Sequence, residues 1–207
     1  SATGRRGSPQ RLRLHERERT YGVGWLPEPQ ALVKTLRLLF AQATRFGTIT
    51  SRPRRELAPL ARTFAENGLE LDRVEVEDAE GLPEALRSLY QREAAALWLG
   101  VDPVTSEPEA FAIVRTAALQ LRMPLITPFD PGPEGKALAG IWVPPAESGR
   151  AACRVIEPLL KDEEPPAHTA VAATELSIDV GVAEALGFKV PEPALKAAVR
   201  VYGVKTR

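Results

Sequence analysis

Several features are scarce or missing in this chain of 207 residues, and each absence removes a class of protein. A single cysteine excludes an intramolecular disulfide and any metal site built from several cysteines. The formal net charge is zero, so the overall charge makes no case for nucleic acid or for an acidic partner. No apolar run approaches the roughly 20 residues that cross a bilayer, and no signal peptide is recognisable.

The sequence also lacks the motifs of common catalytic and nucleotide-binding sites. It contains neither GxGxxG after its first strand nor GxxxxGK[ST], the usual phosphate-binding loops. It contains no GxSxG, and its histidines are only His15 and His168, so nucleophilic hydrolysis is not supported. Asp102 ends a strand as in phospho-acceptor receiver domains, but the loop "TSRPRR" (50–55) would repel their divalent cation. No metal, cofactor or catalytic residue is therefore predicted.

What the chain does contain is a regular alternation of strand and helix patterns. Apolar content of 44% and charged content of 26% are typical of a globular protein. Strands are expected at 45–50, 69–78, 94–101, 123–129 and 137–143. Amphipathic helices are expected between them, on the spacing of their apolar residues. Short connections between alternating strands and helices indicate a doubly wound α/β fold (Rossmann or flavodoxin-like), with a mostly parallel five-stranded sheet.

Three parts of the chain follow from this pattern. Residues 1–20 hold six Arg and two Glu and almost nothing apolar, which indicates a basic, flexible tail or an arm for anionic lipid or a partner. Residues 21–165 form the α/β lobe. Residues 166–207 form an extended segment, "HTAVAATELSIDV" (168–180), and short helices that pack on the lobe or on a partner.

The candidate site lies in the loops that follow the strands, because open α/β sheets bind ligands at the carboxyl ends of their strands. Hydroxyls, carboxylates and one aromatic side chain gather in these loops: Thr50, Ser51, Asp102, Thr105, Phe129 and Asp130. Ser106 and Glu109 are expected to form a capping box for the next helix, with Pro108 in its first turn. This set suits binding of a small polar organic molecule and suggests no reaction.

The helix near residue 156 is expected to bury one apolar face. Ala152, Ile156, Leu159 and Leu160 mark that face. Cys153 lies among them and is interpreted as a buried small hydrophobic residue, not as a nucleophile.

Residues from about 21 to 202 resemble the second half of a family of bacterial ABC-transporter substrate-binding proteins with a type I periplasmic-binding-protein fold. Three stretches carry the likeness: "YGVGWLPEPQALVKTLRLLFAQATRFGTITSRP", "ALWLGVDPVTSEPEAFAIVRTAALQLRMPLITPFD" and the closing "VAEALGFKVPEPALKAA". The resemblance implies that the loops after the first, third and fourth strands form one wall of a solute cleft. It assigns ligand contacts to Thr50, Ser51, Asp102, Thr105, Ser106 and Asp130.

Two departures from the family pattern shape the functional hypotheses. Arg52, Arg54 and Arg55 stand where the family has small polar residues, which favours an acidic solute and adds Arg52 to the candidate contacts. About twenty residues precede the lobe where family members have a complete first lobe, so an uncovered face is expected.

Two hypotheses therefore remain open. The first is a solute-binding component of an ABC-type transport or sensing system, with a permease or another membrane partner, in the periplasm or cell envelope; the solute could be amino-acid-like or acidic. The second is a degenerate lobe that acts as an interaction module, for example as a homodimer through its uncovered face. An enzyme is a weaker third reading.

Overall fold

Strand and helix alternate along the chain as the sequence pattern predicts. The computed structural model describes residues 21–51 and 57–204. The strands are β1 (Gly22–Val23), β2 (Arg45–Thr50), β3 (Glu70–Glu75), β4 (Leu97–Trp98), β5 (Leu125–Thr127), β6 (Ala139–Trp142), β7 (His168–Thr169), β8 (Glu175–Asp179) and β9 (Arg200–Tyr202). The helices are α1 (Pro29–Leu39), α2 (Leu57–Glu66), α3 (Leu82–Gln91), α4 (Pro108–Gln120), α5 (Pro145–Leu159), α6 (Val180–Leu186) and α7 (Glu192–Ala197).

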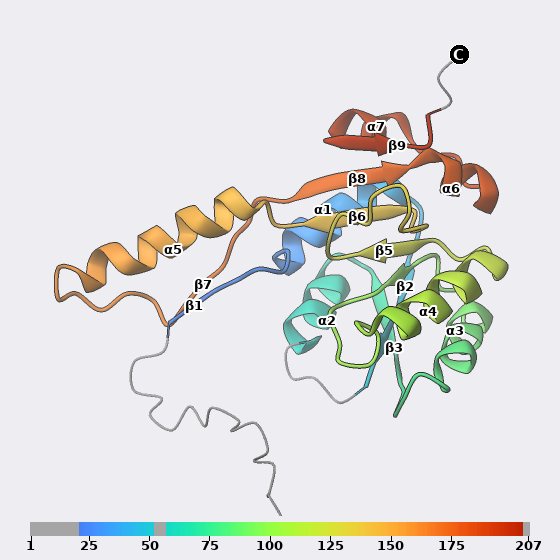
Figure 1. Cartoon of the computed structure of the whole chain (residues 1–207), viewed down its shortest axis with the longest axis horizontal. Coiled ribbons are helices and arrows are strands. Elements are labelled where there is room, and N and C mark those ends of the chain that lie inside the picture. The colour runs from blue at the N-terminus through green and yellow to red at the C-terminus, as the bar shows by residue number, and fades with distance from the viewer. Residues whose placement is uncertain (1–20, 52–56, 205–207) are drawn as a thin grey trace, which may run out of the picture.

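The main sheet has the order β3-β2-β4-β5-β6-β8-β9 within the described residues (Figure 1). Strands β2 to β6 run parallel to one another, which confirms the predicted doubly wound α/β fold. The sheet is wider than the five strands predicted, because β8 pairs antiparallel with β6 and β9 pairs parallel with β8. The strand order reverses between β2 and β4, and this switch point is where open α/β sheets bind ligands.

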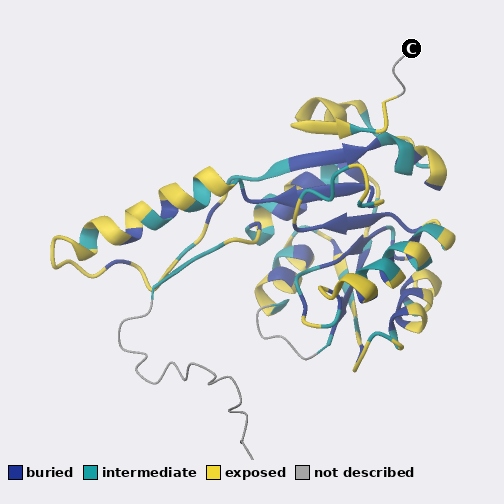
Figure 2. Cartoon of the chain, viewed as in Figure 1, coloured by how far each residue is buried: buried dark blue, intermediate teal, exposed yellow. Residues whose placement is uncertain are grey.

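Apolar side chains pack on both faces of the main sheet in two clusters. Figure 2 shows several of its strands buried and the flanking helices partly exposed. One cluster joins the sheet to α1, α2, α6 and α7, and includes the wholly buried Phe46 on β2. The Phe46 ring meets Phe40 and Phe64 edge-on at centroid distances of 5.8 and 5.7 Å. A second cluster joins the opposite face to α3 and α4. The alternating residues of β2 thus contribute to both apolar clusters, one on each face of the sheet.

Local sequence signals explain where several helices begin and end. Proline lies in the first turn of α1, α3, α4, α5 and α7, where its missing N–H leaves no helical bond unmade. Gly68 follows α2 with φ +67°, a left-handed conformation that suits glycine, and the Leu69 N–H donates to the Phe64 carbonyl at 2.9 Å. The Asp179 carboxylate caps α6 by accepting from the N–H groups of Gly181 and Val182.

The segment 168–180, expected to be one extended stretch, is divided between two sheets. Its first residues form β7, which pairs in parallel with β1 as a two-stranded ribbon. Its last residues form β8 in the main sheet. Strand β9 pairs in parallel along the outer edge of β8.

Helix α5 does not bury the face that the sequence predicted. It extends away from the main sheet beside the β1–β7 ribbon (Figure 1). Its buried residues are Ala151 and Val155, and Ala151 packs with Val143 and Val171. Cys153 is exposed, and Ile156, Leu159 and Leu160 are 50%, 40% and 81% exposed. The prediction failed because helical spacing locates an apolar stripe but does not show whether the rest of the chain covers it.

No helix in the described part of the chain is both long and apolar enough to cross a membrane.

Candidate functional site

The loops that follow β2 and β4 meet at the switch point of the sheet, and Asp102 joins them. The Asp102 side chain is 2% exposed. Its Oδ2 accepts from the N–H and the hydroxyl of Ser51 at 2.9 and 3.1 Å, and its Oδ1 accepts from the Val104 N–H at 3.0 Å. Hydrogen bonds to a buried carboxylate are stronger than neutral ones. Asp102 therefore holds the rim of the site in place.

Ser106 supports the same loop and does not cap α4 as predicted. Its hydroxyl accepts from the Asp102 N–H at 3.2 Å, and its own N–H donates to the Asp102 carbonyl at 2.9 Å. Helix α4 begins at Pro108, and its N-cap residue Glu107 makes no side-chain capping bond. The capping-box prediction is wrong because the Ser106 hydroxyl is bonded within the turn at 102–106, and α4 begins only at Pro108. The prediction that Pro108 lies in the first turn is confirmed.

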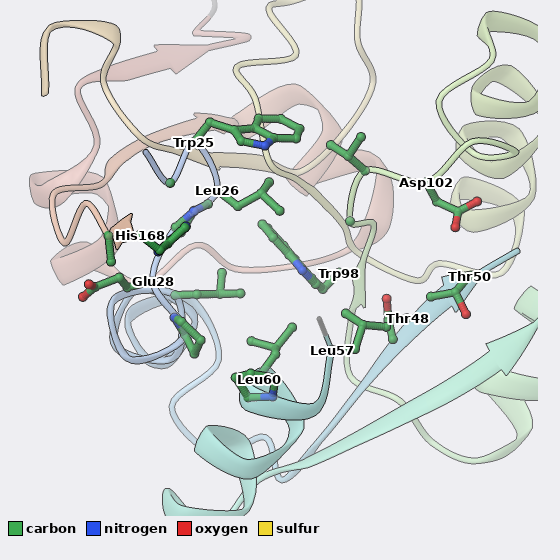
Figure 3. A pocket seen from close by; sticks show the side chains of 18 of the residues that line it. Trp25, Leu26, Glu28, Thr48, Thr50, Leu57, Leu60, Trp98, Asp102 and His168 are labelled. Carbon is green, nitrogen blue, oxygen red and sulfur yellow. The ribbon is translucent and has the colours of Figure 1, made fainter. Parts of the chain in front are cut away.

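Beside this loop lies a cavity of about 360 Å³. Aromatic and aliphatic side chains form most of its wall, notably Trp25, Leu26, Leu57, Leu60 and Trp98. Figure 3 shows the Trp98 ring between Leu26 and Leu60. Trp98 is 3% exposed, whereas Trp25 is 57% exposed. The cavity therefore has a buried wall at Trp98 and an exposed wall at Trp25, and its volume falls within the range of small-molecule sites.

Polar groups stand at two sides of this cavity. Figure 3 shows Thr50 and Asp102 on one side and His168 on the opposite side. Thr50 is 4% exposed, and its hydroxyl has no hydrogen-bond partner in the described structure. A buried hydroxyl without a partner costs about 1–3 kcal/mol. A ligand that bonded to it would recover that cost, so Thr50 marks the polar end of the cavity.

The structure brings together only part of the predicted site. Thr50 and Asp102 line the cavity, and Ser51 lies behind them on Asp102. Thr105 is 2% exposed and has an unpartnered hydroxyl, but it is not among the cavity-lining residues. Arg52 lies outside the described residues. Assignment of these residues to a ligand stays a prediction.

Phe129 and Asp130 are directed elsewhere, since neither lines the cavity. The Phe129 ring packs against Phe111 at a centroid distance of 5.9 Å. Asp130 Oδ2 accepts from the Tyr202 hydroxyl at 2.8 Å and from the Arg200 guanidinium, which lies over the Trp142 ring. In the described structure Asp130 therefore ties β9 to the β5–β6 loop.

The ionisation of Asp130 makes this tie dependent on pH. Burial alone raises the pKa of Asp130, but hydrogen bonds from Tyr202 and Arg200 outweigh it and hold the pKa below its usual value. A depressed folded pKa stabilises the fold above the unfolded value of about 3.9, and that stability is lost as the pH falls through the folded pKa. We expect Asp130→Asn to lower the free energy of unfolding at neutral pH and to lower it much less near pH 3, as measured by urea unfolding.

Asp162→Asn is the control, since Asp162 is exposed and has φ +56°, which asparagine tolerates. We expect little change at either pH. A loss in Asp130→Asn that is the same at both pH values would contradict an ionic role for Asp130.

Sequence reasoning missed most of the cavity wall. Trp25 and Leu26 stand in the segment before α1, and the exposed His168 lines the cavity from β7. Trp98 lies inside a run that predicts only a buried strand. The available signal was the position of Trp98 at the end of β4, on the switch point. No group of three or more His, Cys, Asp or Glu in residues 21–51 and 57–204 is placed to hold a metal ion.

Comparison with solved structures identifies proteins of the same fold. A conserved domain protein from Vibrio cholerae has a TM-score of 0.68 at 17% identity over 87% of this chain. An ABC domain from Streptococcus pneumoniae, in complex with L-Trp, has a TM-score of 0.64 at 18% identity over 84%. A ligand-free, open substrate-binding protein with adhesive properties from Clostridium difficile has a TM-score of 0.63 at 16% identity over 88%.

These similarities confirm the predicted resemblance to substrate-binding proteins at the level of the fold. The chain spans 62% of the length of each of the three structures, in line with the predicted resemblance to one part of such proteins. Neither a protein-family model nor a curated protein sequence matches it.

Proposed function

We propose that the chain binds a small organic solute, without catalysis, in the cavity between Trp25, Trp98 and Thr50. One observation carries the proposal: an apolar cavity at the switch point of the sheet holds a buried hydroxyl without a partner. The solute would place a flat or aliphatic part against Trp98 and a hydrogen-bonding group at Thr50. This is a more apolar ligand than the polar or acidic one that the loops predicted.

The proposed role is that of a solute-binding component of an ABC-type transport or sensing system in the cell envelope, acting with a permease or another membrane partner. The solved structures of the same fold include a substrate-binding protein and an ABC domain with bound L-Trp, and they support this role at the level of the fold. An amino-acid-like solute with an aromatic or aliphatic side chain fits the cavity wall.

A thermal-shift screen tests the proposal. Aromatic and aliphatic amino acids, L-Trp first, are compared with sugars and with dicarboxylic acids that carry no apolar part. A solute that fits the cavity should raise the melting temperature and change the tryptophan fluorescence, because two of the chain's three tryptophans line the cavity. Failure of every solute to raise the melting temperature would count against solute binding.

A second candidate function, an interaction module, is favoured by the exposed apolar residues of α5. It is compatible with solute binding, since α5 does not line the cavity.

A further inference from the structure

The exposed face of α5 carries a regular stripe of small and apolar residues. Ala146, Gly149, Cys153, Ile156 and Leu160 are all exposed and follow one another at offsets of three, four, three and four residues. This spacing places them on one side of a helix and is typical of helices that pack along their length against another helix. Leu159, 40% exposed, flanks the stripe. The opposite side of α5 packs on the β1–β7 ribbon through Ala151.

The stripe is small at one end and large at the other. Ala146 and Gly149 stand near the start of α5, Cys153 stands in the middle, and Ile156 stands near its end, followed by Leu160 as the C-cap residue in right-handed helical conformation. An antiparallel second copy, centred on Cys153, would place Leu160 of that copy at Ala146 and Ile156 of that copy at Gly149. Each bulky side chain then packs against a small one, and a two-fold axis through Cys153 makes the same contacts at both ends of the helix pair.

Charges beside the stripe match the same arrangement. Arg150 and Glu157 lie next to Gly149 and Ile156 on the same flank, at the positions that face each other in an antiparallel helix pair. Arg150 of one copy would then meet Glu157 of the other, twice per dimer. In the single chain these residues pair with near neighbours in the sequence, Arg150 with Glu147, and Glu157 with Lys161 just beyond α5 at 2.8 Å. Such exposed pairs are weak and can exchange partners.

We propose that α5 is a homodimerisation helix, which packs antiparallel against α5 of a second copy along the stripe Ala146–Gly149–Cys153–Ile156–Leu160. The position of α5 supports this, because the helix extends from the body and its exposed residues run along it (Figure 2). The size gradient and the charge order together select a second copy of this chain over an unrelated partner, since both are complementary to themselves.

The single cysteine of the chain makes the test direct. In the proposed dimer Cys153 faces Cys153 of the second copy, so mild oxidation or a short bis-maleimide should give one cross-linked dimer on a non-reducing gel. Light scattering after size exclusion should show a dimer that dissociates on dilution. Ile156→Glu should lower the cross-linking yield at least about tenfold, because it places a charge in the apolar contact. Ile113→Glu, at an exposed isoleucine of α4, is the matched control and should change nothing.

A charge reversal separates this dimer from other interfaces. Arg150→Glu should reduce dimerisation by placing two acidic residues opposite each other, and adding Glu157→Arg should restore it. Circular dichroism checks that each variant is folded. A monomer at every concentration, or a dimer whose cross-linking survives Ile156→Glu, would overturn the proposal. So would a double variant that stays as weak as Arg150→Glu alone.

Discussion

Gly140→Ala should lower the free energy of unfolding by about 3 kcal/mol, among the largest single-residue effects expected in this chain. A Cβ at Gly140 would lie 2.3 Å from the Phe129 carbonyl oxygen and 2.8 Å from Pro131 Cδ. Because the first of these is a backbone atom, relief requires the whole β5–β6 loop to move. That loop is held by the hydrogen bond between Asp130 and Tyr202 of β9. It is also held by the Thr127 hydroxyl, which donates to the same Phe129 carbonyl at 2.8 Å.

Urea unfolding measures the effect at protein concentrations where the proposed dimer is dissociated, with Gly149→Ala as a matched control. No atom lies within 4 Å of a Cβ built at Gly149, which is exposed within α5. Alanine there should raise the stability by up to about 1 kcal/mol, because glycine is the poorer helix former. Equal stability changes in the two variants would show that the loop does not press on β6 as described.

Asp102→Ala should lower the free energy of unfolding by about 3 kcal/mol, since hydrogen bonds to buried charged groups contribute roughly 1.5–3 kcal/mol each. The change removes the acceptor for the N–H groups of Ser51 and Val104, and both loops lose their common anchor. The rim of the cavity should loosen with it. Hydrogen exchange at the Ser51 and Val104 amides, measured beside urea unfolding, should show faster exchange at both.

Asp78→Ala provides the comparison. The Asp78 carboxylate also accepts two backbone N–H groups, from Glu80 and Gly81, but it lies on the surface. Removing the Asp78 carboxylate should lower the free energy of unfolding by well under the value for Asp102, because water replaces the lost acceptor. A similar cost for both variants would mean that burial of Asp102 does not strengthen its bonds.

The sequence predicts the main sheet well because its strands and helices have strong and distinct apolar periods. Each strand from β2 to β6 falls within its predicted range, and the switch point follows from their order. The placement of Thr50 and Asp102 beside each other follows in turn, since neighbouring parallel strands end at the same edge.

The missed features depend on contacts between distant parts of the chain. Asp130 meets partners 70 and 72 residues away on β9, and no local pattern encodes that pairing. Trp25 and His168 reach the cavity through β1 and β7, strands of two residues that are too short to show a period. The exposed face of α5 was predicted as core because helical spacing does not show whether the rest of the chain covers an apolar stripe.

The cavity and α5 share one structural element. The cavity is lined in part by Val23, Gly24 and His168 of the β1–β7 ribbon and its flank, and Val23 also packs against the apolar cluster that includes Ala151 of α5. The ribbon therefore joins the proposed solute site to the proposed dimer helix.

The most direct test of solute binding compares Thr50→Val with Thr105→Val. Both threonines are buried with unpartnered hydroxyls, but only Thr50 lines the cavity. Each variant should raise the stability of the free protein by about 1 kcal/mol, since valine keeps the shape and removes the unpartnered hydroxyl. A fluorescence titration with the solute identified by the screen should then show about tenfold weaker binding to Thr50→Val and unchanged binding to Thr105→Val. Equal affinity of both variants for the solute would contradict a binding site at Thr50.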